Sequence, residues 1–367
     1  MYELYAQTTH SDDYSYKLVQ LPADLLEYVK QQDAELTIKA PSTVNNHMVL
    51  CTKNTTYKLR QMNHSNTVLL MNDLSVNKLE KSVKPTFEGV GQVTSNSLVS
   101  MATLSYEYEP TITKGYIETE RLSVYNGTNT PIPEDQQITI QTLLEESPIS
   151  TVQFYKEWYN KGGCEINGHA VILSRQLLTE LISTLLTILI SEGIDYNESL
   201  GLDQVTSFLI KHDSSITSEI VNTVIQKFGV LDDSNSFKLD HEIISKWFGI
   251  QTLFQTSFNL ISCDDFLVAW KTSLPTFYNV PIDLIQLRGN FCRPTNDKIQ
   301  HLNPSTLSTT DLGMRIKELF AIAKNWDYDE FMPYIQSYIP IGKKPESIVL
   351  KYAKKKRVGK KYIVCQR

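Results

Sequence analysis

Residues 345–367 read PESIVLKYAKKKRVGKKYIVCQR, and their pattern decides the fold that we expect for the C-terminal half of the chain. Pro345 suits the first turn of a helix, where its missing N–H leaves no partner unsatisfied. Apolar side chains then recur at helical spacing, at Ile348, Val349, Tyr352 and Ala353. We therefore expect a helix over 345–357 with this face packed inward. Gly359 then turns the chain, so that 362–366 can form the returning strand of a short wing.

The same succession of helices and a hairpin opened by glycine occurs twice more upstream. Gly229, Gly289 and Gly359 open the three hairpins and lie 60 and 70 residues apart (289 − 229 and 359 − 289). Three helices followed by a two-stranded wing make up the winged-helix variant of the helix-turn-helix. Because this repeat is longer than most helical solenoid repeats, we expect separate small domains in tandem. They are named here the first, second and third modules, at 174–240, 241–303 and 304–367.

The elements of each module follow from apolar periodicity and from helix-start residues such as Thr217, Asp264 and Asp327. In the first module, helices are expected at 174–192, 203–212 and 217–228, and Val230-Leu231 should pair with 237–239. In the second module, helices are expected at 241–255, 264–274 and 281–288, with a wing that extends to 303. In the third module, helices are expected at 309–325, 327–339 and 345–357.

Residues 1–125 are rich in β-forming side chains. Strands are expected at 49–52, 56–59 and 67–71, with a turn at 63–66, and a further pair at 98–108 and 112–122 on either side of Pro110. A helix is expected at 24–30 and a loop at 76–90. So few strands leave unpaired edges, which natural proteins cover, in some cases with a partner's strand. The fold class is therefore α+β: an N-terminal β-barrel-like domain completed by partner chains, a linker with bridging helices (140–146 and 151–160) over 126–173, and tandem winged-helix domains.

The charge of the chain is unevenly distributed. Its formal net charge is −6, yet residues 343–367 contain ten Lys/Arg and one acid, Glu346, a balance of +9. Subtraction leaves 25 basic and 40 acidic residues before position 343, a balance of −15. A basic end on an acidic protein indicates an electrostatic partner for that end, such as nucleic acid, an acidic protein surface or a membrane.

Several functional classes lose support from the sequence. The N-terminus has no secretory pattern, and the apolar stretch 177–190 contains Glu180 and is too short for a membrane span. Five scattered cysteines without a CxxC pair favour a reducing compartment and argue against a structural zinc. No P-loop, dinucleotide-binding, nucleophile-elbow or HExxH motif is found. We therefore expect no enzymatic activity, no cofactor and no metal, and Asp264-Asp265 is better explained as a helix start than as a catalytic pair.

The basic tail is the strongest candidate site. On a helix over 345–357, Lys351, Lys354 and Lys355 would lie opposite the apolar face. Further cations follow at Arg357, in the wing and at the last residue: Lys360, Lys361 and Arg367. A cationic helix face combined with a cationic hairpin is typical of winged helices that contact the duplex backbone. Because no Asn, Gln or Ser dominates the helix, we expect phosphate contacts with little sequence specificity.

Two further roles compete with DNA binding. The run 354–357 (KKKR) is also typical of a nuclear-import signal or of a solvated surface, in which case the chain would be a winged-helix adaptor between proteins. An unrecognised enzyme would need a pocket with convergent, perturbed groups, and the sequence contains no such cluster.

Longer stretches carry a resemblance to a known family. They are YKLVQL (16–21), VLC (49–51), TYKL (56–59), SNTVLLM (65–71) and KYAKKKRVGKK (351–361), together with Phe266, Trp270-Lys271, Leu319-Phe320 and Trp326. In this order they resemble the "defective in sister chromatid cohesion" subunits of the alternative replication-factor-C clamp loader, in a fungal form. The resemblance covers nearly the whole chain and is weakest over 76–147.

The resemblance implies a scaffold rather than a catalyst, since ATP hydrolysis in that assembly belongs to other subunits. The N-terminal β region of the family joins a small cohesion partner subunit and the C-terminal tail of the large subunit. Its partner-binding positions correspond here to Val49, Leu50, Tyr57, Leu59, Val68, Leu69 and Leu70. The family's winged-helix region binds single- and double-stranded DNA and the catalytic subunit of DNA polymerase epsilon. The resemblance therefore implies a nuclear role in clamp loading, replication and cohesion.

One site in the winged-helix region follows from the resemblance, and a second is inferred from the distribution of charge. The DNA-binding positions correspond to Lys351, Lys354, Lys355, Arg357, Lys360, Lys361 and Arg367. The first module, whose surface is the least basic, is expected to face the polymerase.

Overall fold

The computed structural model describes residues 3–6, 15–40, 48–73, 97–128, 131–232, 235–256, 260–295, 297–309, 311–339, 344–359 and 361–367. The chain is a mixed α+β protein that forms two compact units. The N-terminal unit comprises Met1–Ser123, Pro131–Lys161 and Glu165–Val171. The C-terminal unit comprises Val124–Thr130, Gly162–Cys164 and Ile172–Arg367. Each is described by itself below.

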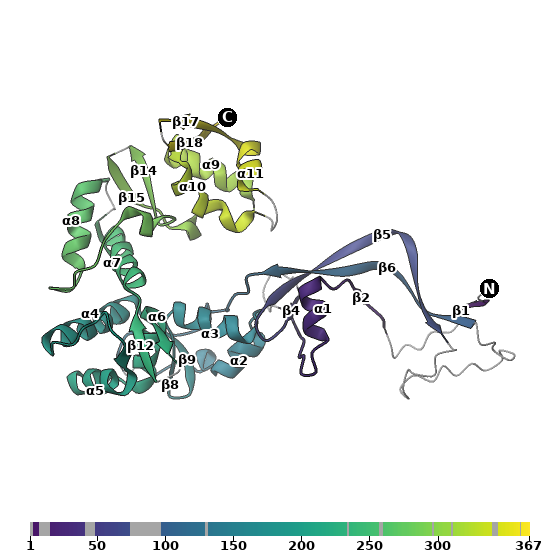
Figure 1. Ribbon diagram of the computed structural model, residues 1–367, viewed down its shortest axis with the longest axis horizontal. Helices are drawn as coiled ribbons and strands as arrows, with labels where there is room; N and C mark the ends of the chain where they lie inside the picture. Colours follow the sequence, from purple (N-terminus) through teal and green to yellow (C-terminus); the bar gives the residue numbers. More distant parts are fainter. Residues whose placement is uncertain are drawn as a thin grey trace. The chain divides into compact units, whose positions relative to one another are not determined.

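A curled sheet dominates the N-terminal unit. Its strands are β1 (Glu3–Ala6), β2 (Leu18–Val19), β3 (Thr37–Lys39), β4 (Val49–Cys51), β5 (Thr56–Asp73) and β6 (Ser97–Thr113). The hydrogen-bonded order is β1-β6-β5-β4-β3, and β2 also pairs with β6. Figure 1 shows β5 and β6 as a long, curved pair. Helix α1 (Ala23–Val29), which confirms the helix expected at 24–30, places Leu25 against Leu50 and Tyr57 in a small core.

Two expectations for this sheet are wrong. Instead of turning at 63–66, the chain continues as β5 to Asp73. The polar stretch lies at an irregularity of the β5–β6 pairing, where the register shifts between Asn63 and Val68. Instead of two strands on either side of Pro110, β6 runs through the proline and ends at Thr113. The Leu59 N–H donates to the Met48 carbonyl (3.1 Å), away from β6, so Leu59 and Pro110 face each other as a pair without backbone hydrogen bonds. The missing N–H of Pro110 therefore removes no bond from the β5–β6 ladder.

The loop expected at 76–90 lies outside the described residues. The bridging helices are present as α2 (Ile140–Glu146) and α3 (Thr151–Asn160), preceded by the short η1 (Glu134–Gln136). They are hydrogen-bonded to the sheet. Lys39 Nζ donates to the carbonyls of Leu144 (2.6 Å) and Ile149 (2.9 Å), and the Ser150 N–H donates to Thr56 Oγ1 (2.8 Å). These helices therefore belong to the same compact unit as the β strands.

A small sheet with the order β7-β9-β8 follows, made of β7 (Val124–Tyr125), β8 (Gly163–Ile166) and β9 (His169–Leu173). The first module then consists of α4 (Arg175–Ser191), β10 (Leu200–Gly201), α5 (Leu202–His212), α6 (Ser218–Phe228), β11 (Gly229–Asp232) and β12 (Ser236–Leu239). Val230 pairs with Lys238 and Leu231 with Phe237, which confirms the expected hairpin. Leu181, Leu185 and Leu189 are buried on α4, so this apolar stretch is a core helix.

The second module contains α7 (His241–Thr256), β13 (Ile261–Ser262), α8 (Cys263–Ser273), η2 (Leu284–Leu287), β14 (Phe291–Thr295) and β15 (Lys298–His301). The helix expected at 281–288 is wrong, since only the short 3₁₀ turn η2 forms. The Asp283 side chain accepts from the Ile285 N–H (2.9 Å), so the helical stretch starts late. Gly289, at φ +88°, ends it after one turn.

The third module contains η3 (Pro304–Thr306), α9 (Leu312–Ile322), β16 (Asn325–Asp327), α10 (Tyr328–Ile335), η4 (Gln336–Tyr338), α11 (Pro345–Tyr352), β17 (Ala353–Val358) and β18 (Lys361–Gln366). Its sheet has the order β16-β18-β17. The helix expected over 345–357 is wrong beyond Tyr352, because Ala353 is extended (φ −139°) and buried. Six residue pairs then join 353–358 to 361–366 across Gly359, at φ +61°. The run of cations is thus part of a strand.

Candidate nucleic-acid interface

The register of the third module's sheet separates its cations between two faces. Trp326 pairs with Val364, which pairs with Lys355, and both apolar side chains of this row are buried. The neighbouring row, Asp327, Ile363 and Lys356, must point the other way because side chains alternate along a strand. We call the side of Trp326 the inner face and the side of Lys356 the outer face.

Lys355 belongs to the inner face and is held by the protein itself. Its Nζ lies 3.0 Å from Glu346 Oε1 on α11, and the side chain is only 17% exposed. The same ammonium lies over the rings of Tyr328 (3.9 Å to the centroid) and Tyr362 (4.4 Å). Burial raises the pKa of Tyr328, and the Lys355 charge opposes that shift. Lys355 therefore joins α11, α10 and the wing, and it is not available to a ligand.

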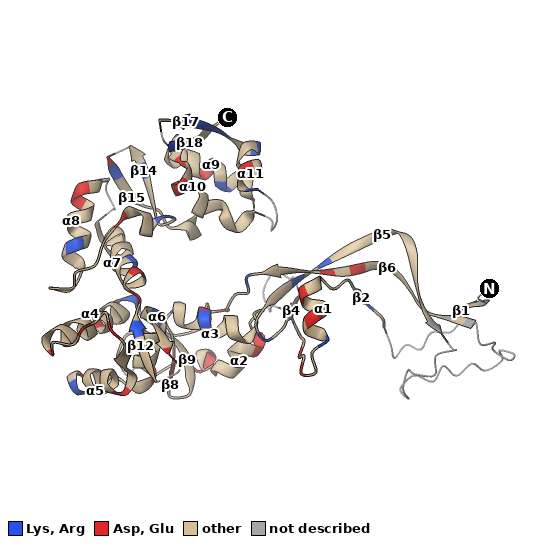
Figure 2. Ribbon diagram, viewed as in Figure 1, with Lys and Arg blue, Asp and Glu red and all other residues tan. Residues whose placement is uncertain are grey.

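The outer face carries the accessible charge. Lys354 and Lys356 are exposed on β17, and Lys361 opens β18 with 71% of its side chain exposed. Figure 2 shows the concentration of basic residues on β17. Lys356 is not among the residues that the sequence singled out. The alternation of a strand over 353–358 is the signal that finds it, since Lys356 shares a face with Lys354.

The remaining predicted residues lie around this face. Lys351 is exposed in the last turn of α11. Arg357 lies near the hairpin turn, where its Nε donates to the Gly359 carbonyl (3.2 Å). Arg367 Nη2 donates to the Leu350 carbonyl (2.7 Å), one of the carbonyls left without a partner where α11 ends. Lys360 lies outside the described residues.

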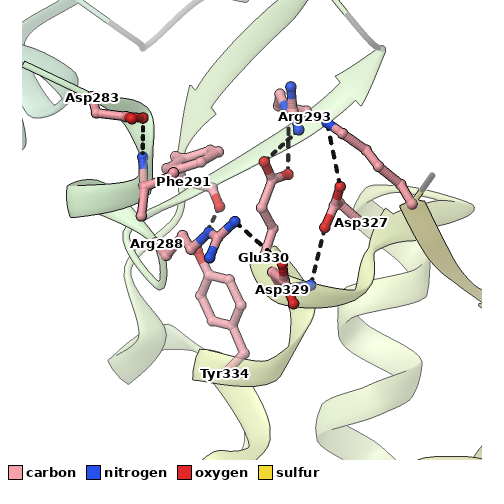
Figure 3. A network of polar contacts seen from close by, with 10 residues as sticks. Asp283, Arg288, Phe291, Arg293, Asp327, Asp329, Glu330 and Tyr334 are labelled. Carbon is pink, nitrogen blue, oxygen red and sulfur yellow. Dashed lines mark hydrogen bonds and ion pairs between the residues drawn. The ribbon is translucent and has the colours of Figure 1, made fainter.

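A network of charged contacts borders the basic surface (Figure 3). Arg293 of β14 donates two hydrogen bonds to the Glu330 carboxylate of α10, and the one from Nε is 3.0 Å long. A second ion pair joins Arg288 to Asp329, with 3.4 Å between Nη2 and Oδ2. The Tyr334 hydroxyl donates to the Phe291 carbonyl (2.7 Å). Burial raises the pKa of Glu330, and the Arg293 guanidinium opposes that shift. These contacts fix the third module against the second.

The basic surface ends at this network. An open cleft of about 390 Å³ is lined there by four acidic residues and three basic ones: Asp283, Asp327, Asp329, Glu330, Arg288, Arg293 and Lys361. Because acids outnumber bases and the arginines are paired, the cleft does not favour a phosphate group. Phosphate contacts are expected on the outer face of the wing instead.

The predicted partner-binding residues fall into two groups in the N-terminal unit. Val49, Leu50 and Tyr57 are buried, and Leu59 packs partly buried against the α1 core, so these residues stabilise the chain's own fold. Tyr57 donates to Asp24 Oδ2 (2.7 Å), and burial raises the pKa of Tyr57 to about 12. Further along β5, Leu69 is half exposed, between the partly buried Val68 and Leu70.

One apolar side chain at a sheet edge was missed from the sequence. Ile38 on β3 is 65% exposed, and β3 is the last strand on its side of the sheet among the described residues. The alternation Thr37-Ile38-Lys39 could have pointed to a strand there, although three residues give a weak signal. Within the described ranges, no group of His, Cys, Asp and Glu is arranged to hold a metal ion. No described helix is both long and apolar enough to cross a bilayer.

Comparison with known proteins identifies relatives over most of the chain. The sequence profile of the family described as "Sister chromatid cohesion protein Dcc1" matches residues 16–335. The chain is 31% identical over 376 residues to Sister chromatid cohesion protein DCC1 of Saccharomyces cerevisiae, an alignment that covers 97% of each protein. It is also 27% identical over 127 residues to Probable sister chromatid cohesion protein DCC1 of Dictyostelium discoideum, covering 33% of this chain and 34% of that one. The chain belongs to the Dcc1 family of sister chromatid cohesion proteins.

Proposed function

We propose that this chain is a nuclear, non-catalytic subunit of an alternative clamp loader, and that its third module is a winged helix that binds the DNA backbone through its wing. The observation that carries the proposal is the placement of Lys354, Lys356 and Lys361 on one exposed face of one sheet. A role in sister chromatid cohesion follows from the family, and DNA binding gives that role a physical basis.

The geometry of the outer face suits phosphates. Lys354 and Lys356 are two residues apart on β17, about 6.6 Å by the rise of a strand. Their long side chains can reach separate phosphates along one strand of nucleic acid. Ile363 lies between Lys356 and Asp327 on this face and offers no hydrogen-bonding group to a base edge. Binding should therefore depend on charge and salt and little on sequence, for single- and double-stranded DNA alike.

The N-terminal unit supports a second part of the proposal, the attachment of partner subunits. The sheet is open, and β3 presents a short edge strand with Ile38 exposed. A strand from the small cohesion partner or from the C-terminal tail of the large subunit could pair with such an edge. Leu69 adds exposed apolar area on β5. We infer that these two positions contact partners, whereas Leu50 and Tyr57 support the fold beneath them.

The first module differs from the third in a way that favours protein contact. The first strand of its wing, β11, carries the exposed apolar residues Val230 and Leu231 shortly before the hairpin turn. The first strand of the third module's wing, β17, carries cations there. Lys227, at the end of α6, is buried with its ammonium over the Trp247 ring (4.7 Å). We propose this module as the contact for the catalytic subunit of DNA polymerase epsilon. The assignment is removed if V230E/L231E and replacements of the exposed charges between Asp203 and Lys227 all leave polymerase binding unchanged.

The DNA-binding proposal is tested by measuring binding of the full chain to unrelated duplex and single-stranded oligonucleotides over a range of salt. The expected result is affinity that falls steeply with salt and differs little between sequences. Absence of binding at low salt would contradict the proposal. It would leave the basic tail as an import signal or a protein contact.

A further inference from the structure

Asp327 brings a negative charge onto the outer face of the wing. Across the sheet, Asp327 of β16 pairs with Ile363 of β18, which pairs with Lys356 of β17. Asp327 and Lys356 therefore lie at opposite ends of one row of side chains. Its Oδ2 lies 3.7 Å from Lys361 Nζ. The aspartate side chain is 17% exposed and the lysine 71%, so the carboxylate is fixed by the fold while the lysine is free to move. Figure 3 shows Asp327 among the charged groups of this border.

The fold needs the shape of this side chain but not its charge. Asp327 is the N-cap residue of α10, where its Oδ1 accepts from the Asp329 N–H (3.0 Å). Asparagine caps helices as well as aspartate does. The pair with Lys361 also contributes little to stability, because one partner is largely solvated. The charge also favours the N-terminus of α10, but this effect is small beside the hydrogen bond of the cap, so the charge contributes little to the stability of the module.

The charge does have an effect on a polyanion that approaches the wing. A phosphate that binds Lys361 beside Asp327 is repelled by the carboxylate, and a phosphate that draws the lysine away gives up the Lys361–Asp327 ion pair. The other charged groups nearby, Arg293 and Glu330, are paired with each other and do not compensate. We infer that Asp327 limits the affinity of the wing for DNA by competing with phosphate for Lys361. This inference rests on the proposed DNA-binding function.

The test is the D327N variant of the full chain, measured against the same duplex at several salt concentrations. The variant should bind about three- to tenfold more tightly at low salt, since removal of a solvated ion pair and gain of one phosphate contact are effects of that size. The salt slope should steepen by up to about one unit. The melting temperature should change little, because the hydrogen bond of the cap is retained and the lost charge interactions are weak.

Two controls separate the competition from a general change in charge. D329N removes the same charge two residues away. The ion-pair partner of Asp329 is Arg288 and not a cation of the wing, so this variant should change the affinity for DNA less than twofold. In a K361Q background, D327N should no longer tighten binding. Equal tightening by D329N, persistence of the gain without Lys361, or no gain at all would each overturn the inference. If the unmodified chain binds no DNA at low salt, the proposed function itself fails.

Discussion

The ammonium of Lys355 lies 3.0 Å from the carboxylate of Glu346, and this contact separates Lys355 from the lysines on either side of it in the sequence. Lys354 and Lys356 face outward on β17, whereas Lys355 is enclosed by Glu346 and two tyrosine rings. Three consecutive lysines thus divide between two roles. The inner one holds the module together, and the outer two are available to a polyanion.

K355M should destabilise the third module by about 1–2 kcal/mol, the combined size of one ion pair and a partly buried cation–π contact. Urea unfolding of the full chain, followed by tryptophan fluorescence and circular dichroism, measures this loss. K354M removes the same charge from the outer face and should change the free energy of unfolding by less than about 0.5 kcal/mol. Equal effects of the two substitutions would contradict the division of roles.

R293M should destabilise the contact between the second and third modules by about 3 kcal/mol, because it leaves the buried Glu330 carboxylate without its partner. The loss should also depend on pH. Burial raises the pKa of Glu330, so above the unfolded value near 4.5 the folded state holds more protons than the unfolded state, and stability falls as pH rises. In R293M this fall should be larger than in the unmodified chain.

The matched control for that experiment is R293M/E330Q, in which the buried group cannot ionise. Its stability should vary less with pH between about 4 and 8 than that of R293M. Thermal unfolding at several pH values measures both variants. If R293M is most stable near neutral pH, the assigned direction for Glu330 is incorrect.

I38E and L69E should leave the N-terminal unit folded and weaken the binding of partner subunits, because both side chains are exposed. Co-purification with the small cohesion subunit and the large-subunit tail measures the effect, and circular dichroism verifies the fold. L50E places a charge in the α1 core and should unfold the unit instead. Unimpaired co-purification of I38E/L69E would exclude these positions from the interface.

G249A should destabilise the second module by about 2–3 kcal/mol. A Cβ at this position on α7 would lie 2.6 Å from Trp270 and 2.8 Å from Leu287, both fully buried. At Gly201 the nearest atom to an added Cβ is 3.8 Å away, so G201A serves as the tolerated comparison. Thermal unfolding of the two variants should separate them by at least about 5 °C.

The order of elements in the C-terminal half could be predicted because each module repeats long apolar helices and a glycine-opened hairpin. The hairpin that joins Val230-Leu231 to 237–239 followed from Gly229 and from the polar residues 232–236, whereas its register is known only from the structure. The end of α11 could not be predicted. The lysines at 354–356 have no apolar periodicity, so the sequence is compatible with either a helix or a strand there. In the structure Ala353 is buried against the core, and the chain continues from it as a strand.

The N-terminal errors have a similar origin. Asn63–Asn66 has the composition of a turn, yet the pairing of β5 with β6 on both sides of it carries the strand through as a bulge. Pro110 is compatible with a strand only because its nitrogen lies at a position where no hydrogen bond to β5 is required. That position depends on the register of the two strands. For the candidate site, the basic character was evident from composition. The separation of Lys355 from Lys356 required the fold.

The most direct test of the account compares two triple variants of the full chain for DNA binding across salt. K354Q/K356Q/K361Q removes three charges from the outer face, and K156Q/K161Q/K211Q removes three exposed charges from elsewhere. The account predicts that the first lowers the salt slope by about two to three units and that the second leaves it nearly unchanged. Equal slopes for the two variants, or DNA binding that survives the first at full strength, would contradict it.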